Sequence, residues 1–163
     1  MKKYLIVLFT VLSFALIFCS VCAGGVLWSI DFSGLTDGVS YSTSGCMNTE
    51  GHLLFYTRGS SAGFTFNLPP GDLSGYSLRI TDRGTVLRMS NASPGIAGID
   101  SPVDITINNI AAVNNIAVDW FNDTAHTYYI GNCLKAGKNT ITISLDPYSN
   151  TKYELKKVEL IAN

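Results

Sequence analysis

Apolar and polar residues alternate in short runs along most of this chain, from about Val26 onward. In such a run, successive side chains point to opposite faces of a strand, so one face is apolar and the other polar. Clusters of Gly, Asn, Asp and Pro separate the runs at intervals of about ten residues, which is the spacing of an all-β sandwich or barrel. No stretch has a convincing helical period. The pattern predicts strands at 26–32, 53–56, 64–68, 76–81, 87–89, 103–108, 116–120, 141–145 and 153–160.

Two details refine this pattern. The pair Asn108-Asn109 tolerates positive φ and suits a tight hairpin turn. In the last strand, the apolar residues change from odd to even positions, and a β-bulge near Lys156-Lys157 would restore a single apolar face. About nine to eleven short strands in so small a domain imply two packed antiparallel sheets.

The first residues have the features of a targeting signal. Lys2 and Lys3 are followed by an uncharged, apolar stretch over 4–21, which ends in small or aliphatic residues up to Ala23. This predicts a signal peptide at 1–23, cleaved after Ala23, and a β-sandwich domain at 24–163. The alternative is an uncleaved anchor, because the apolar stretch reaches the roughly 18 residues that a spanning helix needs, and only then would the membrane be a partner. Both alternatives place the domain outside the cytoplasm, secreted or at the cell surface.

Composition and charge narrow the classes of function. Charged residues make up 14% of the chain, against about 25% in an average soluble domain. The formal net charge is −1, and it becomes −3 if cleavage removes Lys2 and Lys3. Without a basic surplus to neutralise phosphates, nucleic acid is not an expected partner.

Only two cysteines, Cys46 and Cys133, follow the N-terminal segment. In an oxidising compartment they would most simply pair with each other, so the sequence predicts a disulfide. The alternative is two buried free thiols. Their spacing is not that of a zinc or redox site, and neither has a histidine close by in the sequence.

Two segments resemble galactose-binding-like jelly rolls. The first comprises residues 101–110, SPVDITINNI, followed after a gap by residues 134–145, LKAGKNTITISL. The second, residues 153–161 with the sequence YELKKVELI, is similar to the closing strand of many carbohydrate-binding modules of that fold. Within the first segment, Gly137 suits a tight turn and Asn139 can hydrogen-bond the loop backbone. The resemblance implies a two-sheet jelly roll that serves as a sugar binder, an accessory module or a structural spacer.

The resemblance also raises the question of calcium. In several such modules, acidic residues of the closing strand help to hold a structural calcium near the first strand, but here those places are Lys156 and Lys157. Asp31 and Glu159 remain as possible oxygen ligands from the first and last strands. Two carboxylates fall short of the six or more oxygens that calcium takes. No other cofactor is expected.

A sugar site needs an aromatic face for stacking, with polar groups aimed at the hydroxyls. Trp28 and Trp120 are in phase with core residues. The side chains on the opposite phase are better placed for an open polar groove on one sheet, and we take them as candidate ligand contacts: Tyr56, Arg79, Arg88, Asp104, Asp119 and Tyr129. Loop aromatics such as Tyr41 and Tyr148 are a second possibility.

No catalytic centre is predicted. The chain has only three Glu residues, and the two on the closing strand differ in parity, so the paired carboxylates of a glycosidase have no clear candidates. His52 and His126 are isolated in the sequence. The favoured hypothesis is a non-catalytic extracellular carbohydrate-binding domain with a glycan or polysaccharide partner. The alternative is a cell-surface structural, adhesion or assembly subunit that acts through protein contacts, because its low-charge strands leave edges weakly guarded against self-assembly.

Overall fold

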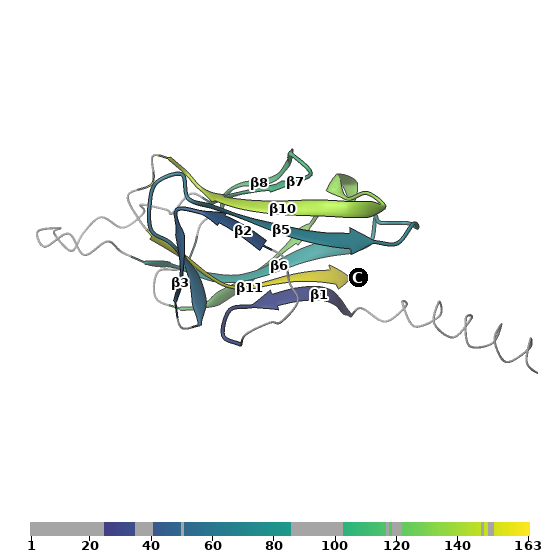
Figure 1. Ribbon diagram of the computed structural model, residues 1–163. Coiled ribbons are helices and arrows are strands. Elements are labelled where there is room, and N and C mark those ends of the chain that lie inside the picture. Colours follow the sequence, from purple (N-terminus) through teal and green to yellow (C-terminus); the bar gives the residue numbers. More distant parts are fainter. Residues whose placement is uncertain are drawn as a thin grey trace, which may run out of the picture.

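The structure is a computed structural model that describes residues 25–34, 41–49, 51–85, 103–116, 118, 122–147, 149 and 152–163. The described residues form eleven β-strands in two antiparallel sheets that lie face to face (Figure 1). This confirms the predicted all-β sandwich. The predicted signal segment at 1–23 and the predicted strand at 87–89 lie outside the described residues. In the part of the chain that is described, no helix is long and apolar enough to cross a membrane.

The larger sheet has six strands. Five of them follow the order β3 (Cys46–Thr49), β4 (His52–Phe55), β11 (Lys152–Ala162), β6 (Tyr76–Thr85) and β9 (Thr124–Tyr129). The sixth, β1 (Val26–Asp31), pairs with the second half of β11, beyond the segment of β11 that pairs with β4. The long strand β11 therefore has β6 along one side, and β4 and β1 end to end along the other.

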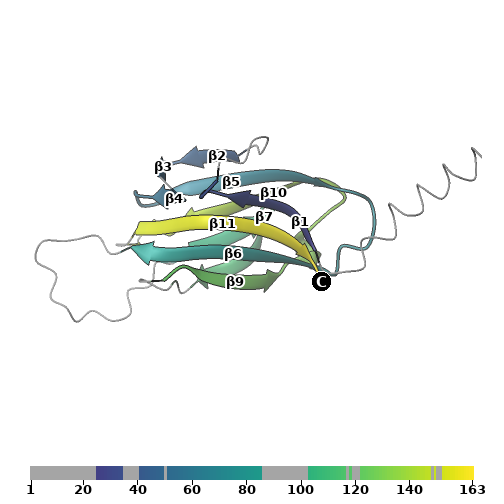
Figure 2. The same cartoon turned by 90° about the horizontal axis from the view of Figure 1, so that it is seen from below.

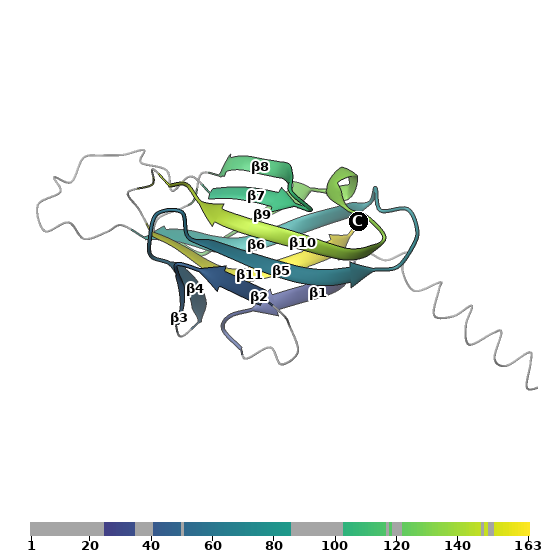
Figure 3. The same cartoon turned by 45° about the horizontal axis from the view of Figure 1, so that its top comes forward.

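The smaller sheet has five strands. Their order is β2 (Tyr41–Ser44), β5 (Ser61–Leu68), β10 (Gly137–Leu145), β7 (Val103–Ile107) and β8 (Ile110–Ile116). Figure 3 shows this sheet lying over the larger one. A 3-10 turn, Gly131–Cys133, leads from β9 toward β10.

Alternation along the strands builds the core, as the sequence predicts. In β5, β7 and β10, alternate residues are fully or almost fully buried. The largest side chains with less than 2% exposure come from both sheets: Tyr153, Phe55, Phe64, Ile30, Leu53, Leu78, Ile80, Ile105, Ile107, Ile130, Ile141 and Ile143. The interior is thus an apolar layer between the inner faces of the two sheets.

The register of β11 contains the predicted bulge. Its pairing with β6 shifts between Leu155 and Lys157. The extra residue lets Tyr153 and Leu155 before the shift, and Val158 and Leu160 after it, all enter the core. The predicted hairpin is also present, because Asn108 and Asn109 take φ values of 53° and 66° between β7 and β8.

A sharp corner carries the chain from β2 in one sheet to β3 in the other. Gly45 occupies the corner with φ of 66°, a conformation that favours glycine. A Cβ at this position would lie 2.4 Å from Thr57 Oγ1 and 2.7 Å from Ser60 Oγ. The Ser60 hydroxyl donates to the Gly45 carbonyl over 2.6 Å. The corner is therefore fixed by this hydrogen bond and by the close packing of Thr57 and Ser60 against Gly45.

Three predictions of secondary structure were incomplete. The polar strands β2 and β3 and the strand β9 were not foreseen, since none has a strong apolar alternation. The sequence pattern places no strand at 110–115, but these residues belong to β8, which begins at Ile110. The second half of the strand predicted at 116–120 lies largely outside the described residues.

The disulfide predicted between Cys46 and Cys133 is not formed, and both residues are free thiols. The Cys46 thiol donates to the Ser61 carbonyl over 3.3 Å, beside the end of β10 that pairs with Ser61. The Cys133 carbonyl accepts a hydrogen bond from Asn108, whose side chain also bonds to Asn139 and Thr140 toward the opposite end of β10. The intervening stretch of β10 is roughly 17 Å long at 3.4 Å per residue. A disulfide tolerates no more than about 7 Å between Cα atoms, so the two cysteines are too far apart to pair. Burial also raises the pKa of the Cys46 thiol to about 11, which keeps it protonated at neutral pH.

Asn139 fastens the loop before β10, as the sequence suggested. Its side chain is completely buried, and its Nδ2 donates to the carbonyls of Lys135 over 2.7 Å and Gly137 over 2.9 Å. Its Oδ1 accepts from the Lys135 N–H over 3.0 Å and from Asn108 Nδ2 over 2.8 Å. One side chain thus joins the loop to the β7–β8 turn.

We expect Asn139→Ala to lower the free energy of unfolding by about 2–4 kcal/mol, because several buried polar groups lose their partner at once. Lys138→Ala, at the exposed neighbouring position, is the matched control and should change stability little. Urea denaturation of both variants measures the difference. Equal stability of the two variants would show that the Asn139 network contributes nothing.

Candidate functional site

The structure separates the residues that the sequence proposed as one polar groove. Arg79 on β6 and Tyr129 on β9 lie on the outer face of the six-stranded sheet. Tyr56 follows the end of β4, and Asp104 lies on β7 in the other sheet. Arg88 and Asp119 lie outside the described residues. The described members of the set therefore do not meet in one groove.

Arg79 is engaged in an ion pair. Its Nε lies 2.7 Å from Oε2 of Glu159, whose side chain is almost fully buried beside it on β11. The hydrogen bond from Arg79 is the main reason why the pKa of Glu159 lies below its usual value. A rigid internal pair of this kind organises the sheet surface and leaves less of the guanidinium for a ligand.

Lys157 lies between the two carboxylates that were considered as calcium ligands. Its Nζ is 2.9 Å from Glu159 and 4.0 Å from Asp31. A hydrogen bond from the Ser33 hydroxyl is the main cause of the lowered pKa of Asp31. Among the described residues, no three His, Cys, Asp or Glu side chains gather as a metal site. The ammonium group thus supplies the positive charge between these two carboxylates.

A second row of charges crosses the same sheet. Glu154 lies 3.0 Å from Nε2 of His52 and 2.5 Å from Nε of Arg83. Asp123 lies 3.9 Å from Arg83 and also pairs with Lys156. The charged side chains on this sheet mostly satisfy one another.

A cavity of about 270 Å³ opens instead at the edge of the sandwich where β1 stands over β5. It is lined by Leu27, Trp28, Phe66, Asn67, Leu68, Pro69 and Tyr76. Trp28 is half-buried, and its ring lies 5.2 Å from the Phe66 ring, centroid to centroid. None of the lining side chains is charged, and the amide of Asn67, the hydroxyl of Tyr76 and the indole N–H of Trp28 are the polar groups among them.

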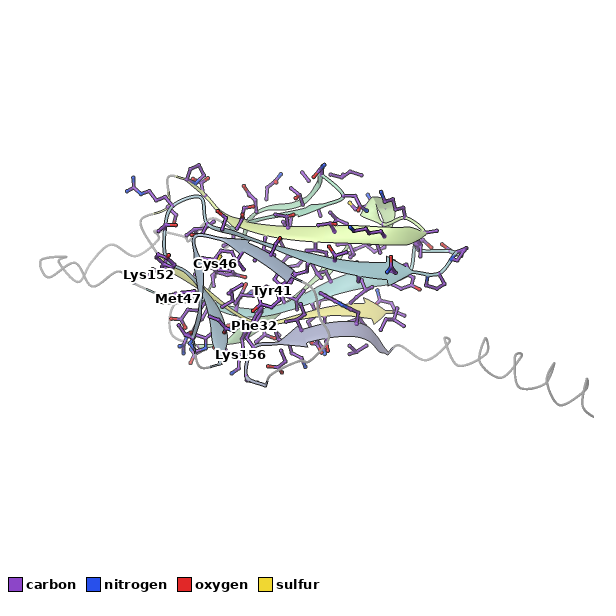
Figure 4. The ribbon with its side chains drawn as sticks, in the orientation of Figure 1. Phe32, Tyr41, Cys46, Met47, Lys152 and Lys156 are labelled. Carbon is purple, nitrogen blue, oxygen red and sulfur yellow. The ribbon has the colours of Figure 1, made fainter. Side chains whose placement is uncertain are left out.

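An aromatic row extends this cavity along the open edge. The Phe64 ring lies 6.4 Å from the rings of both Trp28 and Phe32 and 6.2 Å from that of Tyr41. Phe32 and Tyr41 meet edge to face at 5.7 Å, and the Tyr41 side chain is 40% exposed. Figure 4 shows Phe32 and Tyr41 close together between β1 and β2. We name the cavity and this aromatic row the edge groove.

The chemistry of the edge groove suits a neutral, amphipathic ligand. Exposed or half-exposed aromatic rings can stack on apolar C–H faces, while an amide and a phenol can hydrogen-bond hydroxyl groups. Phe32 directly follows the end of β1, four residues after Trp28, which corresponds to about 13 Å of extended chain at 3.3 Å per residue. The sequence had named Trp28 and Tyr41 separately, but it contained no signal that would bring them to one edge.

A buried polar cluster lies at the opposite edge, between β6, β9 and β11. Asp82 is 1% exposed, and the Tyr153 hydroxyl donates to its Oδ2 over 2.8 Å. Its Oδ1 lies 3.6 Å from Nε2 of His126, and neither of these two buried atoms has a hydrogen-bond partner within the described chain. Burial raises the pKa of Asp82 to about 6, against the opposing effects of Tyr153 and His126.

Comparison with known proteins identifies the fold. No protein-family model matches the sequence, and no curated protein does either. Among solved structures, a variant of a family 29 carbohydrate binding module matches with a TM-score of 0.53 and 14% identity, over 87% of this chain and 92% of the module. The CBM36-1 domain of a multidomain xylanase from the hindgut metagenome of Trinervitermes trinervoides matches with a TM-score of 0.51 and 12% identity, over 86% of this chain and 98% of that domain.

A third similar structure is longer than this chain. A family two carbohydrate esterase from Cellvibrio japonicus matches with a TM-score of 0.50 and 16% identity, over 86% of this chain but only 35% of the esterase. This chain therefore spans about a third of the esterase's length. At such identities the likeness establishes the fold, so the domain is a jelly-roll sandwich similar in fold to carbohydrate-binding modules.

The raised pKa of Asp82 predicts a pH-dependent gain from Asp82→Asn. Below 3.8, the carboxyl is protonated in both the folded and the unfolded chain and costs nothing. As the pH rises from there to about 6, the unfolded chain releases a proton that the folded chain retains, so the folded state loses stability, and above about 6 the full cost remains. Asn keeps an oxygen for the Tyr153 hydroxyl but has no charge. We expect the variant to be more stable at pH 7, by up to about 3 kcal/mol, with little gain at pH 4.

Thermal unfolding at the two pH values measures this effect, and Asp72→Asn, at an exposed position, is the matched control. A loss of stability at pH 7 would contradict the inference, because it would mean that the ionised Asp82 stabilises the fold.

Proposed function

We propose that this domain is a non-catalytic carbohydrate-binding domain and that its ligand lies in the edge groove. The observation that carries the proposal is the uncharged cavity with Trp28 and Tyr76 in its lining, continued by Phe32 and Tyr41 at the open edge. Sugars combine apolar C–H faces with hydroxyl groups, and this groove offers a partner for each. The fold shared with carbohydrate-binding modules of families 29 and 36 adds support.

The proposed ligand is an oligosaccharide or polysaccharide chain. About 13 Å of extended chain separates Trp28 on β1 from Phe32 just past its end, which exceeds the length of a single sugar ring. A chain lying along β1 would contact both ends of the groove, and each ring stacked on an exposed aromatic side chain would add to the affinity.

The residues of the groove support a binding role without catalysis. The cavity lining contains no carboxylate, imidazole or thiol that could act as general acid, general base or nucleophile. The signal-like segment at 1–23 supports export, so we propose that the domain meets its glycan in the medium or at the cell surface. Calcium at Asp31 and Glu159 is not part of the proposal, because Lys157 already pairs with both.

Tyr41→Ala should weaken binding of an oligosaccharide about fivefold, or ~1 kcal/mol, because it removes an exposed ring with little effect on the core. Trp28→Ala should weaken binding further. Affinity electrophoresis on xylan, mannan and β-glucan identifies a binding polysaccharide, and calorimetry with its oligosaccharides measures the change. Release of reducing ends by the wild-type domain would contradict the non-catalytic role.

Tyr129→Ala and Tyr56→Ala are the matched controls, since these tyrosines are 59% and 45% exposed and lie outside the edge groove. Both should bind like the wild type. If instead they lose binding while Tyr41→Ala retains it, the ligand lies at the positions that the sequence pattern favoured.

A further inference from the structure

Among the described residues, strand β9 forms an open edge of the six-stranded sheet. It pairs with β6 on one side and is the last strand in the order of the described residues. Figure 2 shows β9 along the outer edge of that sheet, beyond β6. An edge strand presents a row of backbone N–H and C=O groups that another strand can use.

The hydrogen-bond phase shows which residues of β9 face outward. The Ile130 N–H donates to the Tyr76 carbonyl over 3.2 Å, and β9 runs antiparallel to β6 in the same register. Backbone groups of an antiparallel strand alternate between its two sides, so the even-numbered residues bond to β6. Ala125, Thr127 and Tyr129 therefore direct their N–H and C=O groups away from the sheet.

This edge lacks the features that usually block strand pairing. β9 has the sequence TAHTYY, with no Lys, Arg, Asp, Glu or Pro. Its register with β6 is regular from end to end. By contrast, β8 at the edge of the other sheet pairs with β7 through two irregularities. A regular, uncharged edge rich in Thr and Tyr is suited to accept a strand.

The side chains of β9 are complementary to a second copy of the same strand. In an antiparallel pair centred on Thr127, Tyr129 lies opposite Ala125 of the second copy, so a large exposed ring meets a small residue. Thr127 lies opposite its own equivalent, and Thr–Thr is a favourable cross-strand pair. In this register the outward-facing residues are directly opposite one another, and each such pair can exchange two hydrogen bonds.

We propose that the protein forms a two-fold symmetric dimer through antiparallel pairing of β9 with β9 of a second copy, with the axis at Thr127. The six-stranded sheets of the two copies then join into one continuous sheet. The interface is about 20 Å long at 3.4 Å per residue. It is small compared with stable obligate interfaces, so the dimer is reversible and depends on concentration.

The dimer leaves the edge groove of each copy open. β9 and β1 lie on opposite sides of the central strands β11 and β6, so the two grooves sit at the far ends of the joined sheet. If the proposed sugar binding holds, two grooves on one particle would bind a polysaccharide with higher avidity than one. The dimer itself does not depend on that function.

The symmetry gives a direct test, since a charge at position 127 meets itself across the axis. Analytical ultracentrifugation over a concentration series should show a monomer–dimer equilibrium for protein purified after expression of the full chain. Thr127→Lys and Thr127→Glu should each weaken the dimer at least about fivefold, because like charges directly opposite each other repel. An equimolar mixture of the two variants should restore it, as only the mixed dimer pairs opposite charges.

Thr43→Lys is the matched control, because it adds the same charge to an exposed threonine on β2, an edge of the other sheet. It should dimerise like the wild type. Hydrogen exchange provides an independent measurement: the amides of Thr127 and Tyr129 should become protected as concentration rises. A monomer at every concentration, or a dimer that Thr43→Lys disrupts and Thr127→Lys leaves intact, would overturn the proposal.

Discussion

The pairing of β11 with three other strands is the interaction on which the rest of the fold depends. β11 bonds to β6 along one side, and to β4 and then β1 along the other. A strand this long keeps one apolar face only if its phase is corrected, and the bulge between Leu155 and Lys157 makes that correction. Without it, either Tyr153 and Leu155 or Val158 and Leu160 would face solvent. The core between the sheets would then lose the apolar side chains of half of β11.

The edge groove follows from the same arrangement. Because β4 and β1 share one side of β11, β1 occupies the sheet edge over β5, and Trp28 meets Phe64 and Phe66 from the opposite sheet. An edge strand has no neighbour to cover its outer side, so aromatic side chains that would be core residues farther inside are left partly open. The groove is therefore an uncovered margin of the hydrophobic core, which explains why its lining is uncharged and why Trp28 is both in phase with the core and accessible.

The sequence predicted those features that depend on local pattern. Alternation identified β5, β7 and β10, the parity change located the bulge, and Asn108-Asn109 identified a hairpin. The strands β2, β3 and β9 were missed because residues such as Ser42, Thr43 and Asn48 have no apolar phase to detect.

The candidate site was largely missed for a different reason. Phase predicts the face of a strand on which a side chain lies, but strand order decides which faces meet, and order placed Asp104 and Arg79 on different sheets. The prediction of a Cys46–Cys133 disulfide was wrong for the same reason. The separation of two cysteines in the sequence does not show which end of β10 each of them approaches.

The distribution of charge links the two proposed surfaces. Acidic and basic residues concentrate on β6 and β11, in the middle of the six-stranded sheet, where Arg79, Lys157 and Glu159 neutralise one another. Among the described edge strands, β2, β3, β8 and β9 contain no Lys, Arg, Asp or Glu, and β1 has a single charged residue, Asp31 at its end. Many soluble β-proteins place charges on their edges to prevent pairing, so the arrangement here is the reverse of the protective one. Because the charges on the central strands pair with one another, that face is polar but has few free charges to bind a partner. The edges of the sheets can still bind a partner through apolar rings or through unpaired backbone groups. Since the edge groove and β9 lie at opposite margins, a ligand at one does not obstruct a strand at the other, and one fold can support both contacts.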